Sequence, residues 1–310
     1  MILTVTLNPS VDISYKLEKF DIDASNRVKD VSKTAGGKGL NVSRVLQQLD
    51  QKVGATGFLG GSLGAFIREE LKVNGIKDYF VDCDGATRNC IAVIHDGGHQ
   101  TEILEGGPEI KSSEPQDFME KFRSAVKESE IVTMSGSLPQ GLDKDFYNKL
   151  LTIASENDTP VLLDTGGALL EKALHHDDKP FLIKPNETEI ADLLGKELTT
   201  DYDVVEALKD SLFAGVEWVV VTLGAEGAII KHGKNIYRAS IPKVEAVNPV
   251  GSGDSVIAGF ADGLSKKLEP HQLIKHGLSM GVLNAMEEKT GHIDPDKVEW
   301  CKEQLQIEKR

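Results

Sequence analysis

Short apolar runs alternate with longer amphipathic stretches along most of the chain. Runs rich in Val, Ile and Leu predict buried strands at residues 131–134, 161–163, 181–183 and 218–223. Apolar residues spaced three and four positions apart predict helices at residues 40–49, 63–73, 118–126, 146–154, 204–213, 255–264 and 273–286. This alternation is typical of a mostly parallel sheet whose faces are covered by helices. The pattern therefore predicts an α/β fold.

Two regions interrupt the alternation. Residues ~10–35 alternate polar and apolar positions, and residues ~86–105 hold two apolar segments around Gly97-Gly98. Both patterns predict antiparallel strands inserted in the α/β body, the second pair as a hairpin. A small sheet built from two insertions is either a lid over a site or a subunit interface, and the sequence leaves both possibilities open. His95 and His99 flank the two glycines, which favours a turn over a metal site.

The composition narrows the class of protein. The 310 residues include 49 acidic and 35 basic side chains, a formal net charge of −14, and only 5% aromatic residues. A chain this acidic is a poor nonspecific binder of nucleic acid or of an anionic membrane, so an anionic ligand needs local positive charge. The first nine residues do not resemble a signal peptide, and the three cysteines form no CxxC pair. We expect a cytoplasmic protein.

The most informative motif is Asn248-Pro249-Val250-Gly251-Ser252-Gly253-Asp254, which directly precedes an apolar helix. Its two glycines allow backbone N–H groups to converge at the positive end of the helix dipole, which creates an anion site. An aspartate beside a bound phosphate suits a base that accepts a hydroxyl proton during phosphoryl transfer. The alternative is that Asp254 only caps the helix.

A second glycine-rich motif, Ala35-Gly36-Gly37-Lys38-Gly39-Leu40-Asn41, also leads into a helix. Glycines permit close approach of a ligand, Lys38 supplies positive charge, and Asn41 can hydrogen-bond hydroxyl groups. Because Gly39 follows Lys38, the motif is not a Walker A loop, and no Gly-Lys-Ser/Thr occurs elsewhere, which excludes the P-loop kinases. The alternative is a flexible turn.

Three further loops follow predicted strands. Residues just past a parallel strand face the ligand crevice of such a sheet. The loop 184–189 holds Asn186 and Glu189, which could orient Mg²⁺ through water or could simply cap the next helix. The glycines of loop 222–227 suit a nucleotide phosphate or ribose, and loop 135–139 follows another strand. The recurrence of such loops favours a ligand site.

Taken together, these motifs resemble the PfkB carbohydrate kinase family, which has the ribokinase-like fold, over essentially the whole chain. The motifs at 36–41 and 248–254 stand at the spacing of that family's two signatures, and residues 6–12 and 87–90 resemble its hexose-phosphate branch. Ser252 stands where the family most often has Ala, but both glycines and the aspartate are kept. The resemblance implies one domain over residues 1–310, with a small β-sheet lid inserted at ~10–35 and ~86–105.

The resemblance also implies a role for each matching residue. Asp254 would be the catalytic base, and the backbone amides of Gly251, Ser252, Gly253 and Asp254 would form an anion hole. The sugar hydroxyls and the phosphate of the substrate would be bound by Asp12, Arg27, Gly37, Lys38, Asn41, Arg88, Ser137 and Asp254. The nucleotide would be bound by Lys184, Asn186, Thr222, Gly224, Gly227, Gly251, Gly253 and, in the helix bordering the adenine, Asn284. Asn186 and Glu189 would organise Mg²⁺ through water.

The implied reaction is the ATP- and Mg²⁺-dependent phosphorylation of a ketohexose phosphate. The leading expectation is transfer to the C1 hydroxyl of tagatose 6-phosphate, giving the 1,6-bisphosphate, a step of lactose and galactose breakdown. The alternative is transfer to the C6 hydroxyl of fructose 1-phosphate. A non-catalytic sugar-phosphate sensor is a remote third possibility, since it predicts a damaged base or anion hole, and both are intact. We further expect a homodimer formed through the lid, and neither nucleic acid nor membrane as a partner.

Overall fold

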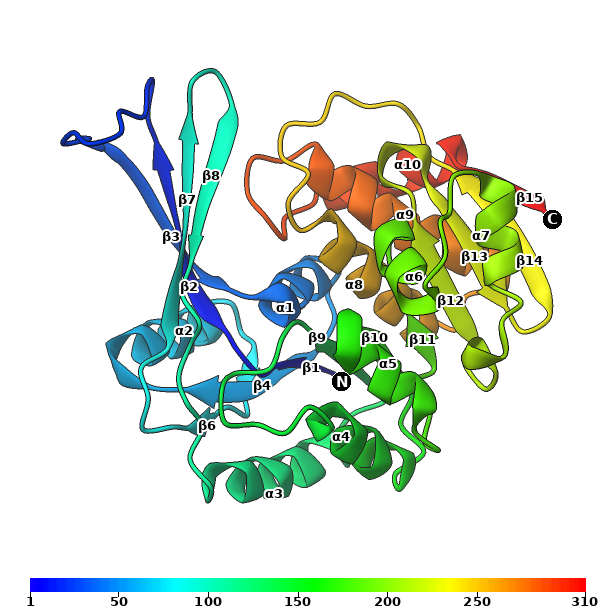
Figure 1. Ribbon diagram of the computed structural model, residues 1–310, viewed down its shortest axis with the longest axis horizontal. Coiled ribbons are helices and arrows are strands. Elements are labelled where there is room, and N and C mark those ends of the chain that lie inside the picture. Colours follow the sequence, from blue (N-terminus) through cyan, green and yellow to red (C-terminus); the bar gives the residue numbers. More distant parts are fainter.

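An eleven-stranded sheet forms the centre of the computed structural model, which describes residues 1–310 (Figure 1). The strand order is β15-β14-β13-β12-β11-β10-β9-β1-β4-β5, and β6 pairs with β4. The strands are β1 (Ile2–Thr6), β4 (Val53–Leu59), β5 (Lys77–Asp78), β6 (Val81–Asp82), β9 (Ile131–Ser135), β10 (Val161–Asp164), β11 (Leu182–Ile183), β12 (Trp218–Thr222), β13 (Ala228–His232), β14 (Asn235–Ser240) and β15 (Gln306–Lys309). Pairing is parallel from β5 to β12 and antiparallel from β12 to β15.

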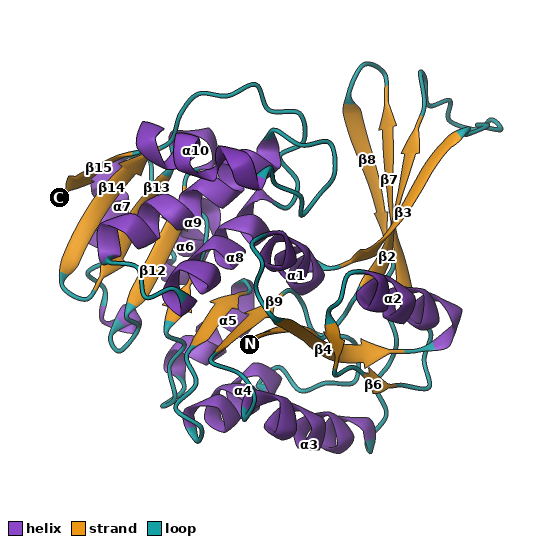
Figure 2. Ribbon diagram, turned by 180° about the vertical axis from the view of Figure 1, so that it is seen from behind, coloured by secondary structure: helices purple, strands orange, loops and turns teal.

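Helices cover both faces of this sheet (Figure 2). They are α1 (Lys38–Gln48), α2 (Gly61–Val73), α3 (Glu114–Val126), α4 (Phe146–Ser155), α5 (Gly167–His175), α6 (Glu187–Leu194), α7 (Asp201–Ala207), α8 (Ser252–Ser265), α9 (Pro270–Ala285) and α10 (Val298–Gln304). Buried side chains of α1, α2, α8, α9 and α10 join one apolar core, and those of α3 to α7 join the other. Consecutive residues such as Val219 and Val220 enter different cores, because side chains alternate across a strand.

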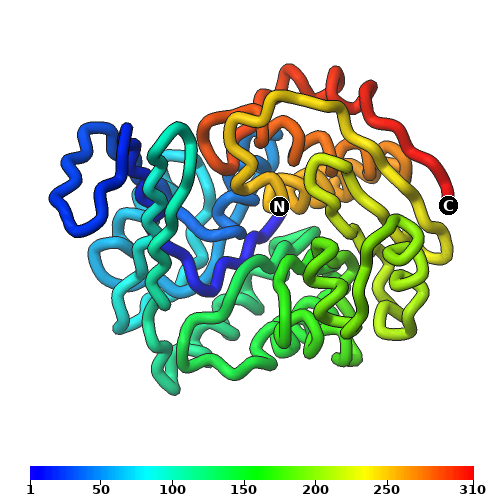
Figure 3. The backbone as a smooth tube through the Cα atoms, turned by 45° about the horizontal axis from the view of Figure 1, so that its top comes forward, coloured from blue at the N-terminus to red at the C-terminus, as the bar shows by residue number.

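A second sheet of four strands projects from the central one (Figures 1 and 3). Its order is β3-β2-β7-β8, made of β2 (Ser10–Lys16), β3 (Asp30–Gly36), β7 (Arg88–His95) and β8 (His99–Leu104). Each insertion forms an antiparallel pair, as predicted, and His95 pairs with His99 across the glycine turn. The sequence did not predict that β2 and β7 pair in parallel, which joins the two insertions into one sheet.

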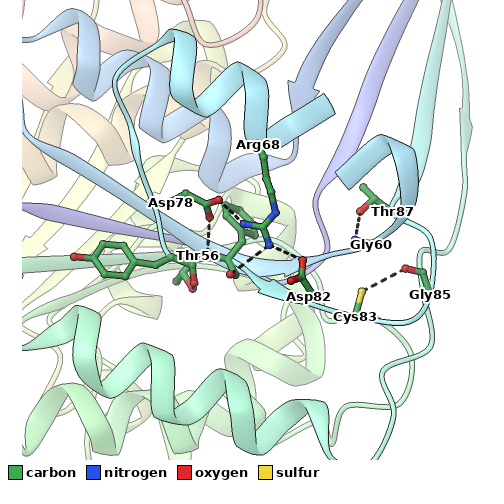
Figure 4. Close-up of polar contacts among 10 residues, drawn as sticks. Thr56, Gly60, Arg68, Asp78, Asp82, Cys83, Gly85 and Thr87 are labelled. Carbon is green, nitrogen blue, oxygen red and sulfur yellow. Dashed lines mark hydrogen bonds and ion pairs between the residues drawn. The ribbon is translucent and has the colours of Figure 1, made fainter. Parts of the chain in front are cut away.

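The segment that leads into β7 of the small sheet is held at the start of α2 (Figure 4). The N–H of Gly60, at the start of α2, donates to Thr87 Oγ1 at 3.0 Å, and the N–H of Thr87 donates back to the Gly60 carbonyl at 3.0 Å. Arg68 of the same helix donates to Asp82 at 2.8 Å and also pairs with Asp78. The chain entering β7 is therefore anchored to α2.

The predicted elements are present, with shifted ends. Each of the seven predicted helices matches α1, α2, α3, α4, α7, α8 or α9, although residues 211–213 form a separate 3₁₀ turn after α7. The four predicted strands are β9, β10, β11 and β12. The periodicity did not single out α5, α6 or α10. No helix of the structure has the length and apolar character that crossing a bilayer requires.

Candidate active site

A cavity of about 1090 Å³ lies between the small sheet and the carboxyl ends of the central parallel strands. The ends of β1, β9 and β10 contribute to it, because parallel strands finish at the same edge of the sheet. The predicted site residues that line it are Asp12, Gly37, Lys38, Asn41, Arg88, Ser137, Lys184, Gly251, Gly253 and Asp254. The fold thus brings together residues from widely separated parts of the chain.

Asp254 lies in the first turn of α8 but does not cap it. Gly251 is the N-cap residue, in the left-handed region at φ +83°, and no side chain caps this helix. Asp254 is 6% exposed, and its Oδ2 accepts a hydrogen bond of 2.7 Å from Nδ2 of Asn41. The capping alternative is therefore wrong, and the carboxylate is held at the positive end of a helix dipole, beside the glycine loop.

The surroundings of Asp254 raise the pKa of its carboxyl group. Burial is the largest influence and, with the negative charge of Asp164, raises the pKa of Asp254 to about 6. Lys38, Lys184 and the hydrogen bond from Asn41 oppose that rise. A carboxylate with this pKa is ionised at neutral pH yet binds a proton far more readily than an exposed aspartate, which is the property a general base needs.

Asp164 bridges two lysines at the floor of the cavity, and the sequence analysis missed it. Its Oδ1 lies 3.3 Å from Nζ of Lys184, and its Oδ2 lies 3.3 Å from Nζ of Lys38. Burial acts to raise the pKa of Asp164, but the two ammonium groups outweigh it and hold that pKa below its usual value. Asp164 ends β10, so the rule that residues at strand ends face the ligand would have found it.

The glycine-rich loop before α1 is shaped by close contacts. A Cβ atom on Gly36 would lie 2.0 Å from Oδ1 of Asp12, so only glycine fits beside that carboxylate. The same Oδ1 accepts a hydrogen bond of 2.7 Å from Ser10 Oγ. Burial raises the pKa of Asp12, while the Ser10 hydrogen bond and the charges of Arg44 and Arg88 lower it. The loop is therefore more than a flexible turn.

Other predicted site residues lie outside the cavity walls. Arg27 is exposed in the loop between β2 and β3, and Ser252 opens α8 beside the glycines. Asn186 and Glu189 form a capping box at the start of α6, with bonds of 2.8 and 2.9 Å, as the capping alternative predicted. Thr222 pairs with Asn186 at the neighbouring strand end, and Gly224 and Gly227 bound the short turn that follows it. These last five residues thus lie at or just after the ends of the neighbouring strands β11 and β12.

Asn284 lies in α9, the helix in which it was predicted, but its side chain is occupied by contacts within the protein. Its side chain is fully buried, and both amide atoms are used within the protein. Nδ2 donates to the Val250 carbonyl at 3.0 Å, while Oδ1 accepts from the Gly291 N–H at 2.8 Å and from Ser255 Oγ at 3.1 Å. Asn284 therefore braces the glycine loop before α8 and offers no free polar atom to an adenine.

Comparison with known proteins identifies the family. The sequence model of the protein family described as "pfkB family carbohydrate kinase" matches residues 5–297. This chain belongs to that family. The resemblance drawn from the two glycine motifs is confirmed, and the protein is a carbohydrate kinase.

Similar proteins and structures support this assignment along the whole chain. A tagatose-6-phosphate kinase of Staphylococcus epidermidis is 46% identical over 308 residues, which are 99% of each chain. A putative phosphofructokinase from Staphylococcus aureus is 33% identical with a TM-score of 0.85, covering 100% of this chain and 99% of its own. Phosphofructokinase-2 from Escherichia coli in complex with potassium is 26% identical with a TM-score of 0.90, covering 97% and 98%. These neighbours confirm the predicted ribokinase-like α/β fold with a separate small sheet.

Proposed function

We propose that the protein transfers the γ-phosphoryl group of ATP to the C1 hydroxyl of D-tagatose 6-phosphate. The products are D-tagatose 1,6-bisphosphate and ADP. The observation that carries the proposal is the full-length relative at 46% identity that is named a tagatose-6-phosphate kinase. The site supplies what this reaction requires: a buried carboxylate, a glycine loop at a helix N-terminus and two converging lysines.

Asp254 is the proposed base. Its carboxylate takes the proton of the C1 hydroxyl as that oxygen forms a bond to the γ-phosphorus, and the bond from the γ-phosphorus to the ADP oxygen breaks. Oδ2 of Asp254 accepts a hydrogen bond from Nδ2 of Asn41, whereas Oδ1 of Asp254 has no hydrogen-bond partner within the protein. Oδ1 of Asp254 is therefore the atom proposed to accept the proton. The backbone N–H groups at the start of α8, with Lys38 and Lys184, stabilise the charge on the transferring phosphoryl group.

Mg²⁺ fits the donor set at the edge of the cavity. No three His, Cys, Asp or Glu side chains gather as a metal site, so the chain itself offers Mg²⁺ only one or two oxygens. Mg²⁺ commonly retains several waters and takes its other ligands from the substrate phosphates. We propose that Glu189 and Asn186 hold it through water: the Asn186 N–H uses only Oε2 of Glu189, which leaves Oε1 available. When bound, Mg²⁺ neutralises charge on the nucleotide phosphates.

The proposed sugar subsite is the part of the cavity lined by the small sheet and by the glycine-rich loop before α1. We propose that Asp12, Gly37, Asn41 and Ser137, which line the cavity, hold sugar hydroxyls and that Arg88 meets the 6-phosphate. Lys38 shares Asp164 with Lys184, so it is assigned to the transferring phosphoryl group and not to the 6-phosphate that the sequence predicted. Arg88 is oriented by bonds from its guanidinium to the Glu105 carbonyl at 2.9 Å and the Asn8 carbonyl at 3.1 Å.

We also propose that two copies pair through the small sheet. Its apolar side chains Val31 and Ile103 are 48% and 55% exposed, which is the support for this interface. Arg27 stays a predicted phosphate ligand, placed on the loop of that same sheet. Cys83, Cys90 and Cys301 form no disulfide. The cytoplasmic location stays a prediction. Light scattering on the purified protein tests the dimer: a monomer at micromolar concentration would refute it.

Initial rates with Mg-ATP on four sugars test the function: tagatose 6-phosphate, fructose 6-phosphate, fructose 1-phosphate and fructose. We expect the highest kcat/KM with tagatose 6-phosphate, with measurable cross-reaction because epimers at one hydroxyl differ by only ~1–3 kcal/mol in shape-based binding. A preference for fructose 1-phosphate would keep the base but reverse the sugar in the site. No turnover of any of the four would refute the proposal.

A further inference from the structure

Arg44 lies on α1, one turn after Asn41, and its guanidinium points into the protein beneath the candidate active site. The guanidinium of Arg44 takes part in none of the ion pairs of the protein. Burial lowers its pKa, because desolvation disfavours the charged form. Its donors instead go to three neutral oxygens: the carbonyls of Ala35 and Thr290, and Oδ1 of Asn41. Arg44 is half-buried, and its buried Nε–H has no hydrogen-bond partner. A guanidinium so placed that forgoes a carboxylate partner is costly, so its hydrogen bonds need an explanation.

We propose that Arg44 is a positioning residue that fixes the side-chain amide of Asn41 so that Nδ2 donates to Asp254. The inference rests on the proposed function, in which Asp254 is the base. The geometry is a directed chain of hydrogen bonds, from Arg44 to Oδ1 of Asn41 and from Nδ2 of Asn41 to Oδ2 of Asp254, the last at 2.7 Å. It orients the carboxylate and leaves Oδ1 of Asp254 for the sugar hydroxyl.

The chemistry of the three groups sets the direction of this chain. A guanidinium can only donate hydrogen bonds and an ionised carboxylate can only accept them, whereas an amide does one at each end. The amide of Asn41 must therefore turn its oxygen to Arg44 and its nitrogen to Asp254. Without Arg44, the amide is free to rotate by 180°, and its oxygen would then face the carboxylate. Asn41 and Arg44 are three residues apart on one helix, so they share a face.

Arg44 also links the site to two neighbouring segments. Ala35 belongs to β3 of the small sheet and directly precedes the glycine loop, and Thr290 lies in the loop after α9. A purely structural role would consist of holding these segments. Gln48, one turn further along α1, provides the contrast: its side chain bonds the Gly291 carbonyl and the Ile293 N–H, both at 3.0 Å. It anchors the same loop without touching Asn41.

The charged groups around the base define the pH readout. Those that act on Asp254 are Asp164 at the end of β10, Lys184 after β11 and Lys38 at the start of α1. Those that act on Arg44 are Asp12 on β2, Asp254 on α8 and Glu70 on α2. Burial lowers the pKa of His292, in the loop after α9, and the charge of Arg44 adds to that effect. Arg44→Met leaves all of these carboxylates and lysines in place, so a shifted pH profile reports the loss of the guanidinium and of its alignment of Asn41.

The test is a double-mutant cycle on kcat and its pH dependence, with Arg44→Met, Asn41→Ala and the double variant. We expect Arg44→Met to lower kcat about 10- to 100-fold and to change KM for ATP less than about twofold. The acidic limb of the pH profile of kcat, where the rate falls as the base is protonated, should move to higher pH. The double variant should be no slower than the worse single variant, because both changes break the same chain. Unchanged kcat in Arg44→Met, or losses that multiply in the double variant, would overturn the inference.

Two further variants keep the test decisive. Gln48→Met should lower the melting temperature but keep kcat within about twofold and leave the acidic limb in place; if it reproduced the effects of Arg44→Met, loop anchoring would explain them and the proposal would fail. If Arg44→Met does not fold, Arg44→Lys replaces it in the cycle, because one ammonium cannot reproduce the fork that reaches both Ala35 and Asn41. The wild-type rate in the same assay separates failure of the proposed function from failure of the proposed role of Arg44. An inactive wild type would refute the proposed function, whereas an active wild type with an unchanged Arg44→Met variant would refute only the role of Arg44.

Discussion

Oδ1 of Asp164 lies 3.3 Å from Nζ of Lys184, and the two side chains are 2% and 7% exposed. Oδ2 of Asp164 lies 3.3 Å from Nζ of Lys38, so this one carboxylate holds the ammonium groups of both lysines at the floor of the cavity before any substrate binds. The protein carries a net charge of −14, and both proposed substrates are anions. The cluster therefore supplies local positive charge that is already oriented, which lowers the reorganisation that phosphoryl transfer requires.

Replacing Asp164 by Asn should lower kcat about tenfold or more and move the acidic limb of the pH profile to lower pH. The charge of Asp164 raises the pKa of Asp254, so its removal lets the base ionise at a lower pH. The two lysines also lose their common partner and with it their orientation. The measurement is kcat at saturating substrates between pH 5 and pH 8. A limb that moved to higher pH would contradict this electrostatic picture.

The wild-type kcat should fall as the pH drops through about 6. Asp254 accepts a proton only when it is ionised, and its pKa is about 6, so each pH unit below that value should cost about tenfold in rate. Sugar phosphates also titrate near pH 6. The Asp164→Asn variant distinguishes the two groups, because it changes the pKa of Asp254 and leaves that of the free substrate untouched.

Asp254→Asn should stabilise the protein while it abolishes most turnover. The pKa of Asp254 is raised from 3.8 to about 6 in the folded state, so the ionised carboxylate disfavours folding at neutral pH. At 1.36 kcal/mol per pH unit, that cost reaches about 3 kcal/mol above pH 6 and vanishes below pH 4. We expect a gain of ~1–3 kcal/mol in the free energy of unfolding at pH 7.5, measured with urea, and little gain at pH 4.

The matched control is Asp192→Asn, an exposed aspartate on α6, which should change the free energy of unfolding by less than ~0.5 kcal/mol at either pH. Equal effects from the two variants would show that general charge reduction, and not the burial of Asp254, is responsible. In the same variants, kcat should fall by several orders of magnitude for Asp254→Asn only.

Gly36→Ala should impair sugar binding through its neighbour. The added Cβ would lie 2.0 Å from Oδ1 of Asp12, so the carboxylate must move away from the position proposed to hold a sugar hydroxyl. We expect KM for the sugar phosphate to rise about tenfold and KM for ATP to stay unchanged. Asp12→Ala should give the same pattern, and combining the two should add nothing. A rise in both KM values would instead indicate a distorted glycine loop.

Sequence reasoning found the parts of the site that follow from connectivity. Lys184 comes after an apolar run, and Asp254 follows two glycines before a helix; each pattern fixes where the residue lies on a parallel α/β sheet. These rules need only the order of the elements. The same rule covers Asp164, which directly follows the predicted strand 161–163 but lacks the glycine or capping pattern that marked the other loops.

Contacts between distant segments could not be predicted in this way. The periodicity of α1 marks Arg44 only as a polar position, and its bond to Thr290 depends on how α9 and its following loop pack against α1. Asn284 likewise owes its role to the Val250 and Gly291 backbones that the fold places around it. The parallel pairing of β2 with β7 joins segments about 80 residues apart. Such contacts arise from tertiary packing, which local patterns do not encode.

The separation between Asn41 and Asp254 has a consequence for protein synthesis. The first 248 residues already contain every parallel strand, both lysines and Asp164, but not the base or its glycine loop. Because chains are made from the N-terminus, a ribosome-bound chain of that length has most of the sugar-side loops and cannot transfer a phosphoryl group. Because Asp254 is the proposed base, we expect activity only after α8 has packed against α1 and brought Asp254 to Asn41.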